Sequence, residues 1–274
     1  MEIIEKQIVG KRINISECED EYVINDDFVA VIDGVTSKTE LMLNNCTTGR
    51  FAAQTIAASI RCFKPDISMK DAISEMTKSI EKVYIENNLY EQAKENVSNR
   101  LAASVIIYSR YFNEIWSIGD CLSMVDGKVY TFSKKIDDII ADARALFIEI
   151  ELINGKTVDE LLTNDSSRNY FFPLLKSSAC FENNSIISDY TFSVIDGFEP
   201  NEKYTHAIKV SSGGNIILAS DGYPKLFGTL EESEKYLSHI LKTDPLCYRE
   251  FKSTKGLVNG NNSFDDRTYV RFRV

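Results

Sequence analysis

The order in which predicted strands and helices follow one another limits the folds that this chain can adopt. Short runs of β-branched and aromatic residues indicate strands, and apolar residues at three- and four-residue steps indicate amphipathic helices. The predicted strands are 22–24, 28–34, 101–109, 114–120, 122–127, 128–133, 192–197, 206–210, 215–222 and 268–274. The predicted helices are 47–63, 68–96, 137–155, 157–164 and 229–242.

Strands and helices do not alternate along this chain, which disfavours a parallel sheet built from strand–helix–strand units. Two sheets packed together with helices outside accommodate the observed order better. We therefore predict an α+β fold. The 274 residues fit one large domain, and no repeat, low-complexity segment or linker rich in proline and glycine divides them. Residues 1–274 are accordingly expected to form a single domain.

Charge and cysteine usage exclude several classes of protein. The net charge of -10, from 41 acidic and 31 basic residues, argues against nucleic acid as a partner. No apolar run is long enough to span a bilayer, and no secretion signal is recognisable, so we expect a cytoplasmic protein without a membrane partner. The six cysteines are scattered without a C-x-x-C pair, which predicts reduced packing residues and no zinc site.

Acidic residues stand at the ends of predicted strands in five separate places. They are Glu19 with Asp20, Asp33, Asp120, Asp221, and Asp265 with Asp266. Each alone is ordinary, because Asp and Gly are common turn residues. Gathered in one place, they would repel one another unless cations lay among them, and hard oxygen ligands suit Mg²⁺ or Mn²⁺. The sequence therefore predicts divalent cations among these acids.

Six segments, in this order, resemble the metal-dependent protein phosphatases of the type 2C (PPM) family. They are "CEDEYVI", "VIDGVTS", "GRFAAQTIAASI", "IGDCL", "ASDG" and "DDRTYV". The resemblance runs through the whole chain and indicates a divergent, bacterial member. It implies a four-layer α-β-β-α sandwich, in which two antiparallel sheets are flanked by helices, and two divalent metals, Mg²⁺ or Mn²⁺, as cofactors at one end.

The resemblance also implies roles for individual residues. Asp33 would bridge the two metals, the Gly34 carbonyl would help to hold one, and Asp221 and Asp265 would hold the other. Glu19 and Asp20 would act mainly through metal-bound waters, and Asp120 belongs to a third metal site. A water shared by the metals would attack phosphorus directly, so that no enzyme residue is phosphorylated. Asp33, Asp221 and Asp265 are thus the predicted catalytic residues.

Haloacid-dehalogenase-type phosphatases offer a rival interpretation of Asp33, because their strand also ends in D-x-D-G. In that family the first aspartate is the nucleophile, and it lies two residues before the second. Val31 occupies that position here. A covalent aspartyl-phosphate route is therefore disfavoured, and Asp33 is better interpreted as a metal ligand.

The chain departs from the type 2C pattern at three positions. Val35 replaces a histidine near the leaving group, and Ile15 replaces an arginine that contacts phosphate. Arg12, with Lys11 beside it, is the predicted substitute for phosphate binding, the alternative being an exposed charge at a strand edge. Lys225 replaces an acid that supports the third metal, and its ammonium could partly stand in for that cation.

Two functions remain open from the sequence. The favoured one is a hydrolase that removes phosphate from phosphoserine or phosphothreonine of a protein, or from a smaller phosphomonoester. The alternative is a catalytically silent protein of the same fold that binds a phosphorylated partner or a metal. The hydrolase is favoured because the sequence retains the three central acids, Asp33, Asp221 and Asp265.

Overall fold

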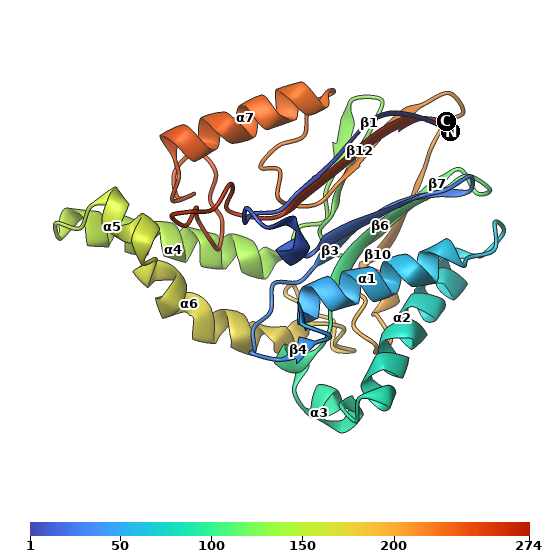
Figure 1. The fold of residues 1–274 in the computed structure, drawn as a ribbon, viewed down its shortest axis with the longest axis horizontal. Helices are drawn as coiled ribbons and strands as arrows, with labels where there is room; N and C mark the ends of the chain where they lie inside the picture. Colours follow the sequence, from blue (N-terminus) through green and yellow to red (C-terminus); the bar gives the residue numbers. More distant parts are fainter.

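Two antiparallel sheets, each with five strands, pack face to face at the centre of the computed structural model, which describes residues 1–274 (Figure 1). Sheet I has the order β1 (Glu2–Val9), β12 (Arg267–Arg273), β11 (Asn215–Ala219), β8 (Leu122–Val125) and β9 (Lys128–Tyr130). Sheet II has the order β10 (Thr205–Lys209), β7 (Glu114–Ile118), β6 (Ala103–Ser109), β3 (Phe28–Gly34) and β2 (Asp20–Ile24). The predicted pair of antiparallel sheets is thereby confirmed.

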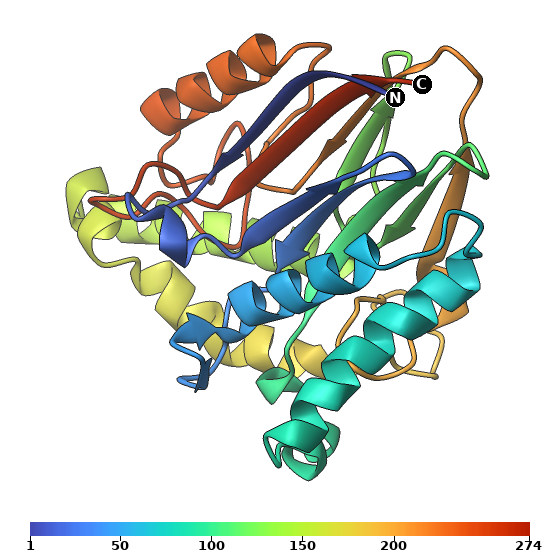
Figure 2. The ribbon, with the colours of Figure 1, turned by 45° about the vertical axis from the view of Figure 1, so that its right-hand side comes forward.

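Helices cover the outer faces of both sheets (Figures 1 and 2). The long helices α1 (Thr48–Arg61) and α2 (Met69–Glu86) lie against sheet II, and α7 (Leu230–Thr243) lies over β1 and β12 of sheet I. This arrangement forms the four layers expected from the sequence. The remaining short elements are α3 (Tyr90–Glu95), the β4–β5 hairpin (Met42–Leu43, Cys46–Thr47) and four 3-10 turns (Ile15–Glu17, Val97–Asn99, Ser178–Phe181, Glu202–Tyr204).

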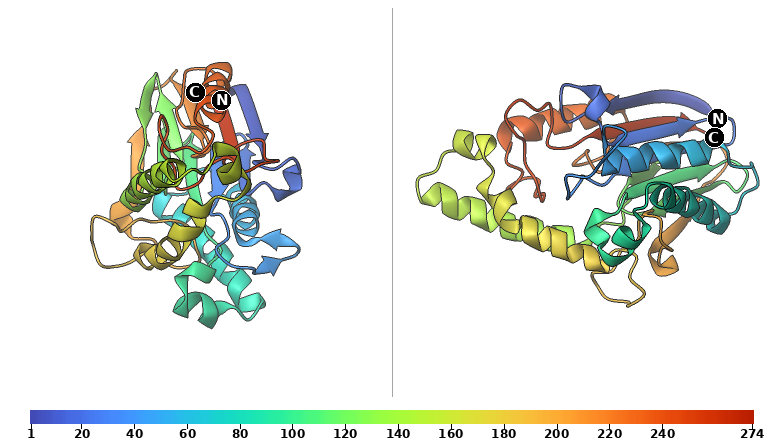
Figure 3. Two further views of the ribbon diagram at one scale, coloured as in Figure 1. Left: turned by 90° about the vertical axis from the view of Figure 1, so that its left-hand side faces the viewer. Right: turned by 60° about the horizontal axis from the view of Figure 1, so that its bottom comes forward.

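Three helices extend beyond one end of the sandwich, away from the chain termini (Figure 3). They are α4 (Lys135–Ile153), α5 (Val158–Thr163) and α6 (Ser166–Ser177). Ile136 and Ile140 of α4 pack against Leu175 of α6. The termini themselves lie side by side, because Glu2 of β1 pairs with Arg273 of β12. None of the helices has both the length and the hydropathy to cross a bilayer.

Strand β3 shows why the run "FVAVI" is apolar without alternation. Phe28, Ala30 and Ile32 face α1 and α2 in one cluster of buried side chains. Val29 and Val31 face sheet I in a second cluster. Successive side chains of a strand point to opposite faces, so a central strand that is covered on both sides needs apolar residues throughout.

The structure differs from the sequence predictions in four segments. Residues 192–197 were predicted as a strand but form only isolated bridges, at Ile195 and Phe192. The predicted helix 68–96 divides into α2 and α3 because Asn88 adopts a left-handed conformation with φ of 57°. Strand β1 and helix α6 were not predicted. In β1 the side chains are exposed or half-buried, so its apolar pattern is weak.

Candidate active site

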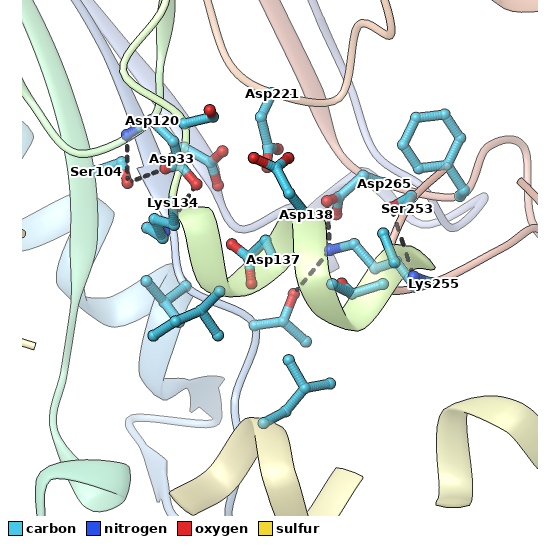
Figure 4. Close-up of a pocket in the computed structure, with 18 of the residues that line it drawn as sticks. Asp33, Ser104, Asp120, Lys134, Asp137, Asp138, Asp221, Ser253, Lys255 and Asp265 are labelled. Carbon is cyan, nitrogen blue, oxygen red and sulfur yellow. Dashed lines mark hydrogen bonds and ion pairs between the residues drawn. The ribbon is translucent and has the colours of Figure 1, made fainter. Parts of the chain in front are cut away.

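The acidic strand ends come together at the end of the sandwich beside α4 (Figure 4). Asp33 ends β3 of sheet II, whereas Asp221 follows β11 and Asp265 precedes β12 of sheet I. All three, together with Asp120 after β7, line one cavity of about 350 Å³. The structure therefore brings together four of the predicted acids, although they are up to 232 positions apart in the sequence (265 minus 33).

Two glycines allow the strand ends to approach this closely. A Cβ atom on Gly34 would lie 2.3 Å from the carbonyl oxygen of Gly49, at the start of α1. A Cβ atom on Gly222 would lie only 1.9 Å from the carbonyl oxygen of Asp266. Any side chain at either position would push the backbone away, so these glycines follow Asp33 and Asp221 for steric reasons.

The carboxylates of Asp33 and Asp221 have no hydrogen bond and no ion pair within the protein, and both face the same cavity (Figure 4). Burial, and then the charges of Asp221 and Asp20, raises the pKa of Asp33 well above its usual value. Desolvation by the surrounding protein atoms, and then the charges of Asp265 and Asp120, raise the pKa of Asp221 to about 7. Because Asp221 is solvent-exposed, repulsion by these neighbouring charges is the main cause of its raised pKa.

Asp265 differs from these two because lysines neutralise it. It forms an ion pair with Lys255, and Lys11 Nζ lies 3.5 Å from its Oδ1 atom. Burial opposes ionisation of Asp265, but the two ammonium groups outweigh it and hold the pKa of this carboxyl below its usual range. Lys11 Nζ also lies 2.9 Å from Glu19 and 3.0 Å from Asp266.

Asp120 is likewise held by a cation of the chain. Lys134, at the start of α4, places its Nζ 2.7 Å from Asp120 Oδ2. Ser104 Oγ donates a short hydrogen bond to the other oxygen. Burial of Asp120 is again outweighed, and its pKa is lowered by Lys134 and Ser104.

Glu19 and Asp20 lie behind the cavity wall. Asp20 Oδ2 accepts hydrogen bonds from Ser220 Oγ at 2.7 Å and Thr268 Oγ1 at 2.9 Å. Its Oδ1 atom is buried without a partner. Because Asp20 belongs to sheet II and both donors to sheet I, this carboxylate ties the two sheets together directly beneath the site. Glu19 accepts a hydrogen bond from Thr47 at 2.7 Å.

The structure does not bring Arg12 to the cavity. Its guanidinium donates to Glu17 at 2.6 Å, and the Arg12 side chain is 57% exposed. Lys11 enters the acidic cluster instead. Lys225 also points elsewhere, because its ammonium lies 5.0 Å from the centre of the Phe227 ring. Lys134, and not Lys225, therefore supplies the ammonium group that lies beside Asp120.

Five basic side chains line the cavity, and none of them was among the predicted site residues. They are Lys38, Lys134, Arg168, Lys252 and Lys255. None belongs to one of the six segments on which the prediction of the site rested.

The donor set fits a divalent cation in part. No three histidine, cysteine, aspartate or glutamate side chains are already grouped closely enough to hold a metal. However, Asp33 and Asp221 lack partners, and hard carboxylate oxygens are the ligands that Mg²⁺ and Mn²⁺ prefer. Asp265 fits the same role once its carboxylate leaves Lys255.

Comparisons with known proteins give similarities at the level of structure. No protein-family model matches this sequence, and no curated protein sequence matches it either. The serine/threonine phosphatase PstP/Ppp of Mycobacterium tuberculosis aligns at 14% identity and a TM-score of 0.46, over 98% of this chain and 97% of that one. RsbX in complex with magnesium aligns at 13% identity and a TM-score of 0.45, over 99% of this chain and 98% of that one. Stp1, a serine/threonine phosphatase from Staphylococcus aureus, aligns at 14% identity and a TM-score of 0.46, over 100% of this chain and 97% of that one.

Proposed function

We propose that this chain is a divergent metal-dependent phosphatase of the type 2C kind. Its substrate would be phosphoserine or phosphothreonine of a protein, or another phosphomonoester. A water between two divalent metals, Mg²⁺ or Mn²⁺, would attack phosphorus directly. The motif order in the sequence supports this proposal, and so does the geometry of the cavity.

One observation carries the proposal. Asp33 and Asp221, from opposite sheets, present carboxylates to one cavity without any hydrogen bond or ion pair. Adjacent carboxylates that lack partners destabilise the fold through mutual repulsion, and their pKa values are raised. A chain keeps such a pair at low cost only if a cation binds between them, so the arrangement supports a divalent metal site.

Asp33, Asp221, Asp265 and the Gly34 carbonyl are the groups that would hold the metals. Bound divalent cations supply Lewis acidity, which lowers the pKa of a coordinated water and offsets charge on phosphoryl oxygens. The chain's own contribution is positioning. Asp20 holds the two sheets at a set separation through Ser220 and Thr268, and this tie keeps Asp33 opposite Asp221.

A silent, partner-binding protein is the second candidate, and one observation favours it. Lys11 and Lys255 neutralise Glu19 and Asp265, two of the acids that the resemblance assigns to metals. If these ion pairs persist in solution, metals would bind more weakly than the motifs suggest.

The test is hydrolysis of para-nitrophenyl phosphate with Mn²⁺ or Mg²⁺ and with a chelator, combined with calorimetric titration of Mn²⁺. Asp33→Ala and Asp221→Ala are compared with wild type, and Asp66→Ala, an exposed acid outside the cavity, is the control. We expect activity that requires metal and that falls at least 100-fold in both cavity variants but not in the control.

Other outcomes separate the two candidates. Metal binding without hydrolysis of any phosphomonoester would support the silent protein. If the wild type neither binds Mn²⁺ nor hydrolyses para-nitrophenyl phosphate, the assignment of Asp33 and Asp221 as metal ligands is overturned.

A further inference from the structure

Two cations that line the cavity have no anionic partner. Lys38, in the loop after β3, makes no hydrogen bond and no ion pair, although it is only partly exposed. Arg168, in α6, donates from one nitrogen to the carbonyl oxygen of Thr254 at 2.9 Å and makes no ion pair. The other three cations of the cavity, Lys134, Lys252 and Lys255, are each paired with an aspartate.

The charged groups around this pair do not neutralise it. Glu182, Lys134 and Asp137 face Lys38, as does Arg168. Arg144, Asp265, Asp165 and Asp137 face Arg168. None of these carboxylates comes within ion-pair distance of either cation. Burial and the charge of Asp196 raise the pKa of Glu182 to about 8, so this acid compensates the charge of Lys38 less than an ordinary glutamate would.

An unpaired cation inside a protein cavity costs folding free energy, because it has lost water without gaining a counter-ion. Burial lowers the pKa of both Lys38 and Arg168, which reflects this cost. The Thr254 carbonyl holds the Arg168 guanidinium in place, and its remaining donors are free. Two such cations in the lining of one cavity, with the Arg168 guanidinium already oriented, are suited to bind an anionic group.

The anion bound here differs from the phosphoryl group that would be cleaved. Arg168 lies in α6 (Ser166–Ser177), and Figure 4 shows this helix on the far side of the cavity from Asp33 and Asp221. Asp137, in the first turn of α4, acts on both cations. The guanidinium of Arg168 is therefore supplied from the α6 side of the cavity, across from the two free carboxylates.

We propose that Lys38 and Arg168 bind a second anionic group of the substrate, and that the substrate is a phosphopeptide with an acidic side chain near its phosphorylated residue. This inference rests on the proposed phosphatase function for the position of the phosphoryl group. The net charge of -10 repels acidic peptides at long range. Recognition of such a peptide therefore depends on these two local cations.

Peptide binding, measured by fluorescence anisotropy, tests the proposal without requiring catalysis. The probes are a labelled phosphothreonine peptide with flanking Glu residues and the same peptide with Gln in their place. We expect the wild type to bind the Glu peptide about tenfold more tightly than the Gln peptide. Lys38→Gln and Arg168→Gln should abolish this preference. Lys176→Gln, which removes an exposed charge from the same helix as Arg168, should retain it.

Kinetics supply the second readout. For Lys38→Gln and Arg168→Gln, the ratio of kcat/KM for the Glu peptide to kcat/KM for para-nitrophenyl phosphate should fall about tenfold, because only the peptide carries a second anionic group. Lys38→Arg and Arg168→Lys should recover part of the loss. Equal melting temperatures would show that the variants are folded.

Three results would overturn or separate the two proposals. A wild type without preference for the Glu peptide, or a preference untouched by both Gln variants, would overturn the acidic-peptide inference. An unchanged kinetic ratio, with both substrates losing activity together, would mean that the pair binds the cleaved phosphoryl group and would also overturn it. Retained Glu preference without hydrolysis of any phosphomonoester would reject the phosphatase function alone.

Discussion

Lys255 forms an ion pair with Asp265, one of the acids that we propose as metal ligands. Lys11 Nζ approaches the same carboxylate to 3.5 Å. One carboxylate cannot be fully neutralised by an ammonium group and a divalent cation together, so each competes with the other. In this molecule the strength of metal binding is therefore coupled to the position of Lys255.

Removing that competitor should strengthen metal binding. We expect Lys255→Met to bind Mn²⁺ about tenfold more tightly than wild type, measured by calorimetry at low ionic strength. Lys70→Met is the matched control, because Lys70 pairs with Glu202 outside the cavity and both side chains are largely exposed. Weaker binding by Lys255→Met would show instead that this lysine orients Asp265 for the metal.

The stability of the metal-free protein should increase as the pH is lowered from 8 to 6. Burial, opposed by its hydrogen bonds, raises the pKa of Asp20 to about 8, and burial and Asp196 raise the pKa of Glu182 to about 8. A group with a raised pKa stabilises the folded state while protonated and loses that contribution as the pH rises through the folded value. The expected change is on the order of 2 kcal/mol for each group.

Melting temperatures in a chelator at pH 6, 7 and 8 measure this effect. Glu182→Gln should reduce the slope, because glutamine does not ionise and its shape is similar. Acids whose pKa is lowered, such as Asp165, remain ionised in both states across this range and contribute nothing to the slope. A melting temperature that falls from pH 8 to pH 6 would contradict the prediction.

Gly222 should not tolerate alanine. The added Cβ would lie 1.9 Å from the carbonyl oxygen of Asp266, so the segment after β11 would have to move away from the start of β12. We expect Gly222→Ala to lose about 2–4 kcal/mol of unfolding free energy and to bind metal more weakly. Gly228→Ala is the control, since its Cβ would meet no atom within 4 Å. Equal urea midpoints for the two variants would refute the steric explanation.

Arg144 should be essential for the loop that carries Lys255. Its side chain is fully buried and donates to the carbonyl oxygens of Leu246 at 2.8 Å and Ser253 at 3.1 Å. It also pairs with Asp165 at 2.7 Å. Arg144→Met would leave these acceptors unpaired, and we expect a loss of about 3–5 kcal/mol.

Chemical denaturation measures the effect of Arg144→Met, with Arg61→Met at an exposed position as the control. A loss below about 1 kcal/mol would mean that water replaces the guanidinium without difficulty.

The order of the strands and most of the helices could be predicted from local pattern. A few neighbouring residues are enough to predict each of three features: the continuous apolar run of β3, the Ala- and Ile-rich face of α1, and the strand ends marked by Asp-Gly. The prediction of a strand at residues 192–197 was wrong. The apolar side chains of this segment are buried by packing beside the start of β6, without a ladder of backbone hydrogen bonds. Burial, rather than strand pairing, explains their composition.

By itself, the sequence determined which acids stand at strand ends, and therefore that Asp33 and Asp221 are candidates for metal binding. Only the tertiary structure decided which cations would meet them. Lys11, Lys134 and Lys255 pair with acids of the site, and Lys38 and Arg168 remain free. Strand ends follow from local hydropathy, whereas side-chain pairing depends on distances between elements that are remote in the chain. No local pattern could therefore have shown that Lys11 enters the acidic cluster and Arg12 does not.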